Sequence, residues 1–149
     1  MKLKELFEWE NNNKLVLPDF QRDYVWTAER IKQIISSFLV KLPIGSLLIL
    51  EGASDDFKSR KLCFPFETPQ PREECYYLLD GQQRLAALKV VFSDLYKADN
   101  GWVNQWDNTY SQLRARWFVR TIPEENEEDI FGWKTLDFTG FSEKEPQDV

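Results

Sequence analysis

The chain has 149 residues and a formal net charge of −6, which suits one soluble domain with a hydrophobic core. It has no histidine, and Cys63 and Cys75 are not spaced as metal ligands, which excludes histidine-based zinc sites, HNH-type nuclease chemistry and Ser-His-Asp or Cys-His catalysis within these residues. No apolar run approaches membrane length and no leader pattern appears, so we expect a cytoplasmic protein without a membrane partner.

The first part of the chain predicts two helices and one short strand. Residues 4–12 are expected to form the first helix, and residues 15–17 a strand that Pro18 ends. Thr27 is suited to cap a second helix, which Pro43 would stop. Apolar residues of this second helix recur on one face, at Ile31, Ile34, Ile35, Phe38, Leu39 and Leu42.

The segment before Thr27 is dense in aromatic and charged residues, and reads Pro18-Asp19-Phe20-Gln21-Arg22-Asp23-Tyr24-Val25-Trp26. One interpretation is a loop that leaves its charged residues in water and buries its aromatic residues, Phe20, Tyr24 and Trp26. The other is one wall of a binding site, because Gln21 and Arg22 form a Gln-Arg pair beside a helix start and a second such pair occurs further along the chain.

The middle of the chain predicts two paired strands and a third helix. Residues 46–51 are largely apolar, which predicts a strand buried on both faces. Residues 52–74 are polar and contain proline, as expected for an excursion between paired strands. Residues 75–79 predict the partner strand, and residues 82–98 a helix.

The most informative motif, Asp80-Gly81-Gln82-Gln83-Arg84, lies between that strand and that helix. A strand that turns into a helix leaves backbone N–H groups pointing outward, where an anion can bind them. Gly81 would let a ligand approach the backbone, and Arg84 can pair with phosphate oxygens. The alternative is a plain helix start, in which Asp80 caps the helix and Gln83 completes a capping box.

The end of the chain differs in pattern and in charge. Residues 112–122 alternate like a strand with a basic face, which is more often solvated than bound to phosphate. Residues 123–149 carry nine acidic and two basic residues, whereas the rest of the chain carries 17 basic and 16 acidic residues. This neutral body is not the basic surface that DNA binding requires. We therefore expect DNA contact through a missing domain or a partner.

The acidic segment also keeps large aromatic side chains, which a disordered tail would not retain. We expect two parts, a domain over residues 1–122 and an acidic, aromatic-containing segment over residues 123–149, which would start a further domain. Its aromatic residues should be poorly anchored, or should pack on a second copy of the chain in a homo-oligomer. These residues are Phe131, Trp133, Phe138 and Phe141.

Three motifs together resemble one known family. PDFQRDYVW at residues 18–26, PIGSLLIL at residues 43–50 and LLDGQQRLAAL at residues 78–88 occur in this order. The chain resembles the N-terminal domain of GmrSD-type, modification-dependent restriction systems over roughly residues 1–95. The resemblance implies a nucleotide-binding fold related to ParB and sulfiredoxin. This is an α+β fold in which helices flank a small mixed sheet.

The resemblance also implies a function and a site. It implies that the chain binds and hydrolyses a nucleoside triphosphate (GTP, ATP or CTP), with Mg²⁺, as part of a restriction system used in phage defence. Nuclease activity is not expected in these residues. The implied catalytic residues are Asp80, Gln83 and Arg84, with Asp80 also the candidate Mg²⁺ ligand. The implied nucleotide-binding residues are Gln21, Arg22, Gly81, Gln82 and Arg84.

A second class of function stays open at this point. The nucleotide would be a switch ligand that changes contacts with DNA or a partner protein, without hydrolysis by this chain. Under either reading, the two Gln-Arg pairs are expected to lie side by side, because both would serve one anion. No GxxxxGK[ST] sequence occurs, so a triphosphate site here is not a P-loop.

Overall fold

The computed structural model describes residues 1–93, 95, 108–122 and 131–135. Within them the fold is α+β, as expected. The helices are α1 (Leu3–Asn11), α2 (Ala28–Leu39) and α3 (Gln82–Phe92), with a short 3₁₀ turn over Ser111–Leu113. The strands are β1 (Leu15–Pro18), β2 (Leu48–Ala53), β3 (Ser59–Arg60), β4 (Glu74–Asp80), β5 (Ala115–Val119) and β6 (Phe131–Thr135).

A four-stranded mixed sheet has the order β2-β4-β1-β3, and β5 and β6 form a separate antiparallel hairpin. In the sheet, β1 and β4 run parallel, with Leu15 opposite Tyr76 and Val16 opposite Tyr77. Both strands therefore end at the same edge. The motif segments that follow them leave the sheet side by side, although about 60 residues separate them in sequence. Ligands bind most often beyond the carboxyl ends of parallel strands.

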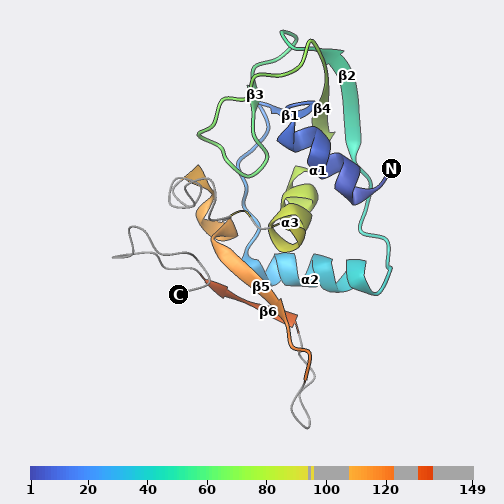
Figure 1. Ribbon diagram of the computed structural model, residues 1–149, viewed down its shortest axis with the longest axis vertical. Coiled ribbons are helices and arrows are strands. Elements are labelled where there is room, and N and C mark those ends of the chain that lie inside the picture. Colours follow the sequence, from blue (N-terminus) through green and yellow to red (C-terminus); the bar gives the residue numbers. More distant parts are fainter. Residues whose placement is uncertain (94, 96–107, 123–130, 136–149) are drawn as a thin grey trace.

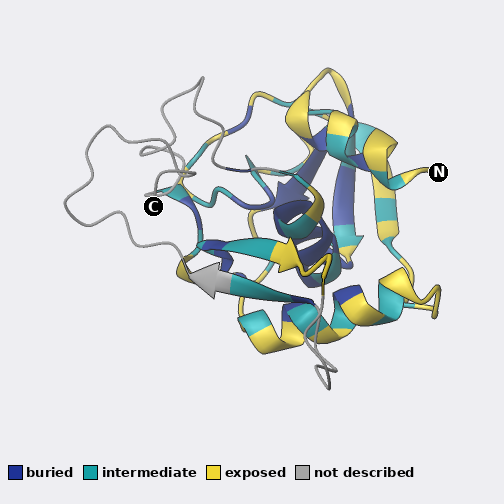
Figure 2. Ribbon diagram, turned by 60° about the horizontal axis from the view of Figure 1, so that its bottom comes forward, coloured by how far each residue is buried: buried dark blue, intermediate teal, exposed yellow. Residues whose placement is uncertain are grey.

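The main core lies between one face of the sheet and the helices. Figure 1 shows α3 between the sheet and α2. Buried residues cover nearly every side of α3, as Figure 2 also shows. A helix that is buried on nearly every side lies in the middle of the fold, and the polar side chains that it buries, such as Gln83 and Lys89, need partners there. The main buried residues of this core include Leu15, Leu17, Ile31, Ile35, Leu78, Leu85, Ala86 and Ala87.

A buried ion pair ties α1 to α3. Lys89 Nζ pairs with the Glu10 carboxylate, and these two residues are only 4% and 2% exposed. Lys89 also donates a hydrogen bond to Asn11 Oδ1 at 2.9 Å, and Glu10 Oε1 accepts one from the Leu62 N–H at 3.2 Å. Nearby, burial raises the pKa of the Cys63 thiol to about 12. Both cysteines are buried and reduced.

One of the expected strands differs from the structure in its burial. The prediction that the strand over residues 46–51 is buried on both faces is wrong. This strand, β2, is an edge strand and exposes Leu48 and Leu50. Ile49 packs against the core from this strand. A continuous apolar run predicts a strand, but it does not say how many neighbours will cover that strand.

Helix lengths also differ from expectation. Thr27 caps α2 as expected, accepting a bond from the Arg30 N–H, but α2 ends at Leu39 before Pro43 is reached. The third helix ends at Phe92, and Ser93, in extended conformation, closes it. Residues 96–98 of the expected helix lie outside the described residues. The excursion over residues 52–74 joins paired strands β2 and β4 as expected, and it also contains β3.

The hairpin brings part of the acidic segment into the fold. β5 contacts α3 and β6 contacts α2. Phe131 is buried and stacks on Trp117, with ring centroids 5.3 Å apart. The expectation of poor anchoring is therefore wrong for Phe131, because strand pairing with β5 carries its ring into the core. Phe138 and Phe141 lie outside the described residues. Among the described residues, no helix is long and apolar enough to cross a membrane.

Candidate functional site

The motif after β4 forms a sharp turn into α3. Asp80 ends β4, Gly81 precedes the helix with φ of +97°, and Gln82 is the first helical residue. A β-carbon on Gly81 would lie 2.3 Å from Leu47 Cδ2. The backbone conformation therefore favours glycine here, and a larger residue would also have to push the Leu47 side chain aside. The turn leaves the N-terminal amides of an 11-residue helix at the edge of the sheet.

The side chain of Gln83 holds the aromatic segment that follows β1. Its Oε1 accepts hydrogen bonds from the Val25 and Trp26 N–H groups at 2.9 and 3.3 Å, and its Nε2 donates to the Asp23 carbonyl at 3.2 Å. The capping-box interpretation is therefore wrong. Gly81, which has no side chain to act as a cap, takes the N-cap position, and the Gln83 carboxamide is turned to the neighbouring loop.

Gln21 and Arg60 fix the same segment from its other side. Gln21 Nε2 donates to the Leu79 carbonyl at 2.8 Å. The Arg60 guanidinium donates to the Gln21 carbonyl and, at 2.8 Å, to Asp23 Oδ1. Sequence reasoning missed Arg60, since nothing in the pattern of the polar excursion marks one arginine as a partner of a loop about 40 residues earlier.

Arg84 brings in a third segment. It pairs with Asp80 Oδ2 at 3.0 Å and donates to the Ser46 carbonyl. Gly45 lies against the guanidinium, and a β-carbon there would be 3.3 Å from Arg84 Cζ. The turn before β2, which begins the PIGSLLIL motif, thus lies over Arg84. All three motifs meet at the end of β4, a convergence that their order in the sequence did not reveal.

These residues enclose one small cavity of about 80 Å³. Gln82 is only 4% exposed, and its Nε2 has no hydrogen-bond partner among the described residues. Arg22 is exposed and also lines the cavity. Every residue predicted for the site borders the cavity, so the expected juxtaposition of the two Gln-Arg pairs is confirmed. The complete lining is Gln21, Arg22, Trp26, Asp80, Gly81, Gln82, Gln83 and Arg84.

The charge of the cavity is mainly positive but includes one carboxylate. The side chain of Asp80 is 67% exposed and that of Arg84 24% exposed, so water reaches their ion pair. No group of three or more histidine, cysteine or acidic residues suited to a metal occurs within the described part of the chain. A single carboxylate suits Mg²⁺ only where phosphates and water supply the remaining ligands.

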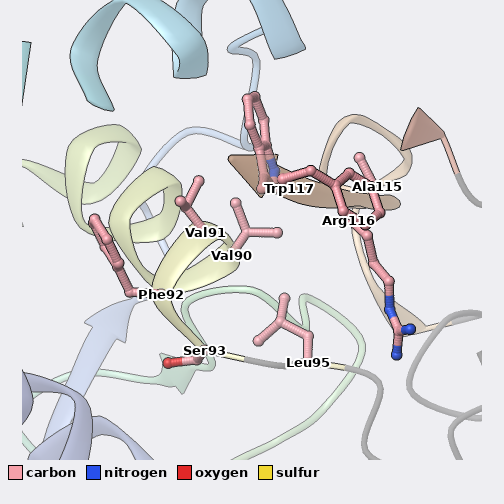
Figure 3. A pocket seen from close by; sticks show the side chains of 9 residues that line it. Val90, Val91, Phe92, Ser93, Leu95, Ala115, Arg116 and Trp117 are labelled. Atoms are coloured by element: carbon pink, nitrogen blue, oxygen red, sulfur yellow. The ribbon is translucent and has the colours of Figure 1, made fainter. Parts of the chain in front are cut away.

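A second cavity, of about 210 Å³, lies between the end of α3 and β5. Figure 3 shows Val90, Val91 and Leu95 close to Ala115 and Trp117. Most of the described residues in its wall are apolar, and Arg116 is the charged one among them. The end of β4 is the candidate site because, among the described residues, it brings two arginines, one carboxylate and three glutamine side chains to one cavity.

The ion pair beneath the aromatic segment provides a test of this geometry. The hydrogen bond from Arg60 holds the pKa of the Asp23 carboxyl below its ordinary value of 3.8. A lowered pKa means that the ion pair stabilises the fold at pH values above the ordinary pKa of the carboxyl group. This contribution is lost as pH falls through the folded-state pKa. We expect NMR titration of Asp23 to show the low pKa, and Arg60→Ala to return it to the ordinary range. An unchanged pKa in that variant would contradict the contact.

Comparison with known proteins gives the family. A family model described as the GmrSD restriction endonuclease, N-terminal domain, matches residues 3–146. The chain belongs to this family. The GmrSD match extends past the motif-bearing part of the chain and includes the β5–β6 hairpin. The uncharacterized protein MJ0686 of Methanocaldococcus jannaschii is 34% identical over 94 residues, which cover 58% of this chain and 16% of that protein. The chain thus spans about a sixth of the curated relative that it matches.

Proposed function

We propose that the cavity at the end of β4 binds the phosphates of a nucleoside triphosphate. The observation that carries this proposal is the Gln82 side chain, whose buried Nε2 has no partner among the described residues and borders the cavity. A buried donor without a partner costs free energy, on the order of 1–3 kcal/mol, unless a ligand accepts its hydrogen bond. A phosphate oxygen is a suitable acceptor, because the α3 N-terminus and Arg22 favour an anion at the same place.

The arrangement also suggests a role for each residue in nucleotide binding. Arg22 and Arg84 would neutralise phosphate charge, and Gln82 and Gln21 would orient oxygens by hydrogen bonds. Gln83 already uses its carboxamide on the aromatic segment, so we assign it a positioning role beneath Arg22 rather than direct contact with phosphate. Asp80 beside phosphates would be repelled unless a cation lay between them, which favours binding of the nucleotide with Mg²⁺.

Hydrolysis by Asp80 and Arg84 is the reaction that we propose for this site, in a restriction system whose DNA contacts lie elsewhere. A carboxylate can orient a water molecule for attack on phosphorus, and an arginine can stabilise the charge that develops. The competing function is a nucleotide switch without hydrolysis, and one observation favours it, namely that Asp80 is the only carboxylate among the described residues that line the cavity. Phosphate release measured beside nucleotide affinity separates the two.

We expect Arg84→Ala to weaken binding of ATP, GTP or CTP by about 10- to 150-fold, the loss of one charge-assisted contact of roughly 1.5–3 kcal/mol. Isothermal titration calorimetry with each nucleotide, in the presence of Mg²⁺, would measure the affinity. Because Arg84 also binds Ser46 and Asp80, the folding of the Arg84→Ala variant has to be checked by thermal unfolding. Gln82→Leu is a second variant that keeps the ion pair and should also weaken binding.

The matched control is Arg72→Ala. Arg72 is exposed, and it donates to the Asn12 carbonyl away from the cavity. Its loss should leave nucleotide affinity unchanged. Equal affinities of wild type, Arg84→Ala and Gln82→Leu, all folded, would refute the proposed site.

A further inference from the structure

Phe20 is an aromatic residue held firmly in place yet left largely in water. Phe20 is 63% exposed. The turn that carries it is fixed by the Asp19 N–H, which donates to the Lys58 carbonyl at 2.8 Å, and by the Gln21 N–H, which donates to the Pro18 carbonyl at 3.1 Å. The turn therefore holds the backbone of Phe20 while most of the ring stays open to a ligand.

The ring lies at the end of a short series of aromatic contacts on the outer face of the sheet. Phe20 packs edge-to-face against Phe57, with ring centroids 5.6 Å apart. Phe57 packs in the same manner on Tyr77 of β4, at 5.0 Å. Leu79, two residues after Tyr77 on that strand, packs against the same cluster and is half-buried. The result is an apolar surface next to Asp80, where the candidate cavity begins.

The residues that follow Phe20 in the chain lead from this surface to the phosphate cavity. Gln21 binds the Leu79 carbonyl, and both Gln21 and Arg22 line the cavity. The cavity measures only about 80 Å³, whereas pockets that enclose a drug-sized ligand measure about 300–1,000 Å³. A nucleotide held there by its phosphates would have its base outside the cavity, on a neighbouring surface.

We propose that Phe20 is the stacking surface for the base of the nucleotide, an inference that rests on the proposed phosphate site. Aromatic side chains stack on every base, because each base has a π-face. A protein partner would need a wider apolar surface than one ring. The residues exposed around Phe20 are instead charged: Asp19, Arg22, Asp23 and Lys58.

The experiment compares nucleotides with inorganic tripolyphosphate, which has the phosphates but no base. Phe20→Ala should lower the affinity for ATP, GTP and CTP at least fivefold, in the presence of Mg²⁺, and leave that for tripolyphosphate unchanged. Phe20→Trp should keep nucleotide affinity. Phe66→Ala is the control, since Phe66 is 77% exposed and does not border the cavity.

The outcomes separate this inference from the proposed function. Equal losses for nucleotide and tripolyphosphate would show that Phe20 only positions Gln21 and Arg22, and would overturn the stacking role. Unchanged affinity for both ligands in Phe20→Ala would overturn it as well. If tripolyphosphate and nucleotides all fail to bind the wild-type chain, the phosphate site itself is wrong. Loss of tripolyphosphate binding in Arg84→Ala, with loss of nucleotide alone in Phe20→Ala, would support both proposals.

Discussion

Glu10→Ala is expected to destabilise the fold by about 3–5 kcal/mol, because it leaves the Lys89 ammonium buried without its counter-ion. The change also removes the acceptor of the Leu62 N–H. For a domain of this size the midpoint of thermal unfolding should fall by roughly 6–20 °C. Chemical denaturation would give the free energy directly.

The chain offers a matched control in the same helix. Lys4 and Glu8 form an exposed ion pair at 3.8 Å, so Glu8→Ala should cost less than about 1 kcal/mol. Replacing both buried charges, as Glu10→Leu with Lys89→Met, should restore much of the stability, since apolar residues of similar volume avoid the desolvation cost. Equal small losses for Glu10→Ala and Glu8→Ala would contradict a buried pair.

Gly81→Ala is expected to lower both stability and nucleotide affinity. The φ of +97° costs an alanine about 1–3 kcal/mol, and its β-carbon would displace Leu47. The same β-carbon would lie 3.3 Å from Arg84 Nη2 and 3.4 Å from the Ser46 carbonyl oxygen that binds this guanidinium. The variant should therefore lose phosphate binding under conditions in which it is still folded.

Gly132→Ala is the control for that change. Nothing lies within 4 Å of a β-carbon at Gly132, and its backbone does not have the positive φ of Gly81. Its stability and binding should match the wild type within about 0.5 kcal/mol. A Gly81→Ala variant as stable as Gly132→Ala would show that the turn does not need glycine.

The sequence predicted which segments lie together better than it predicted the burial of the elements around them. The change from strand to helix at Gly81 and the helix cap at Thr27 depend on neighbouring residues, and local patterns carry that information. Which groups Gln83 and Arg60 bind depends instead on residues far away in the chain. The exposure of β2 likewise depends on strand order, which no run of apolar residues specifies.

The parallel pairing of β1 with β4 has a consequence for how the protein folds. The bonds from Gln83 to residues 23–26 join positions 57–60 apart in sequence, so neither strand segment can build the cavity alone. Contacts of this range close large loops and form slowly compared with local ones. The cavity exists only in the native state, so a ligand that binds it stabilises the folded protein. The apparent melting temperature therefore rises with the concentration of that ligand. Thermal shift with increasing nucleotide would then report folding and occupancy together.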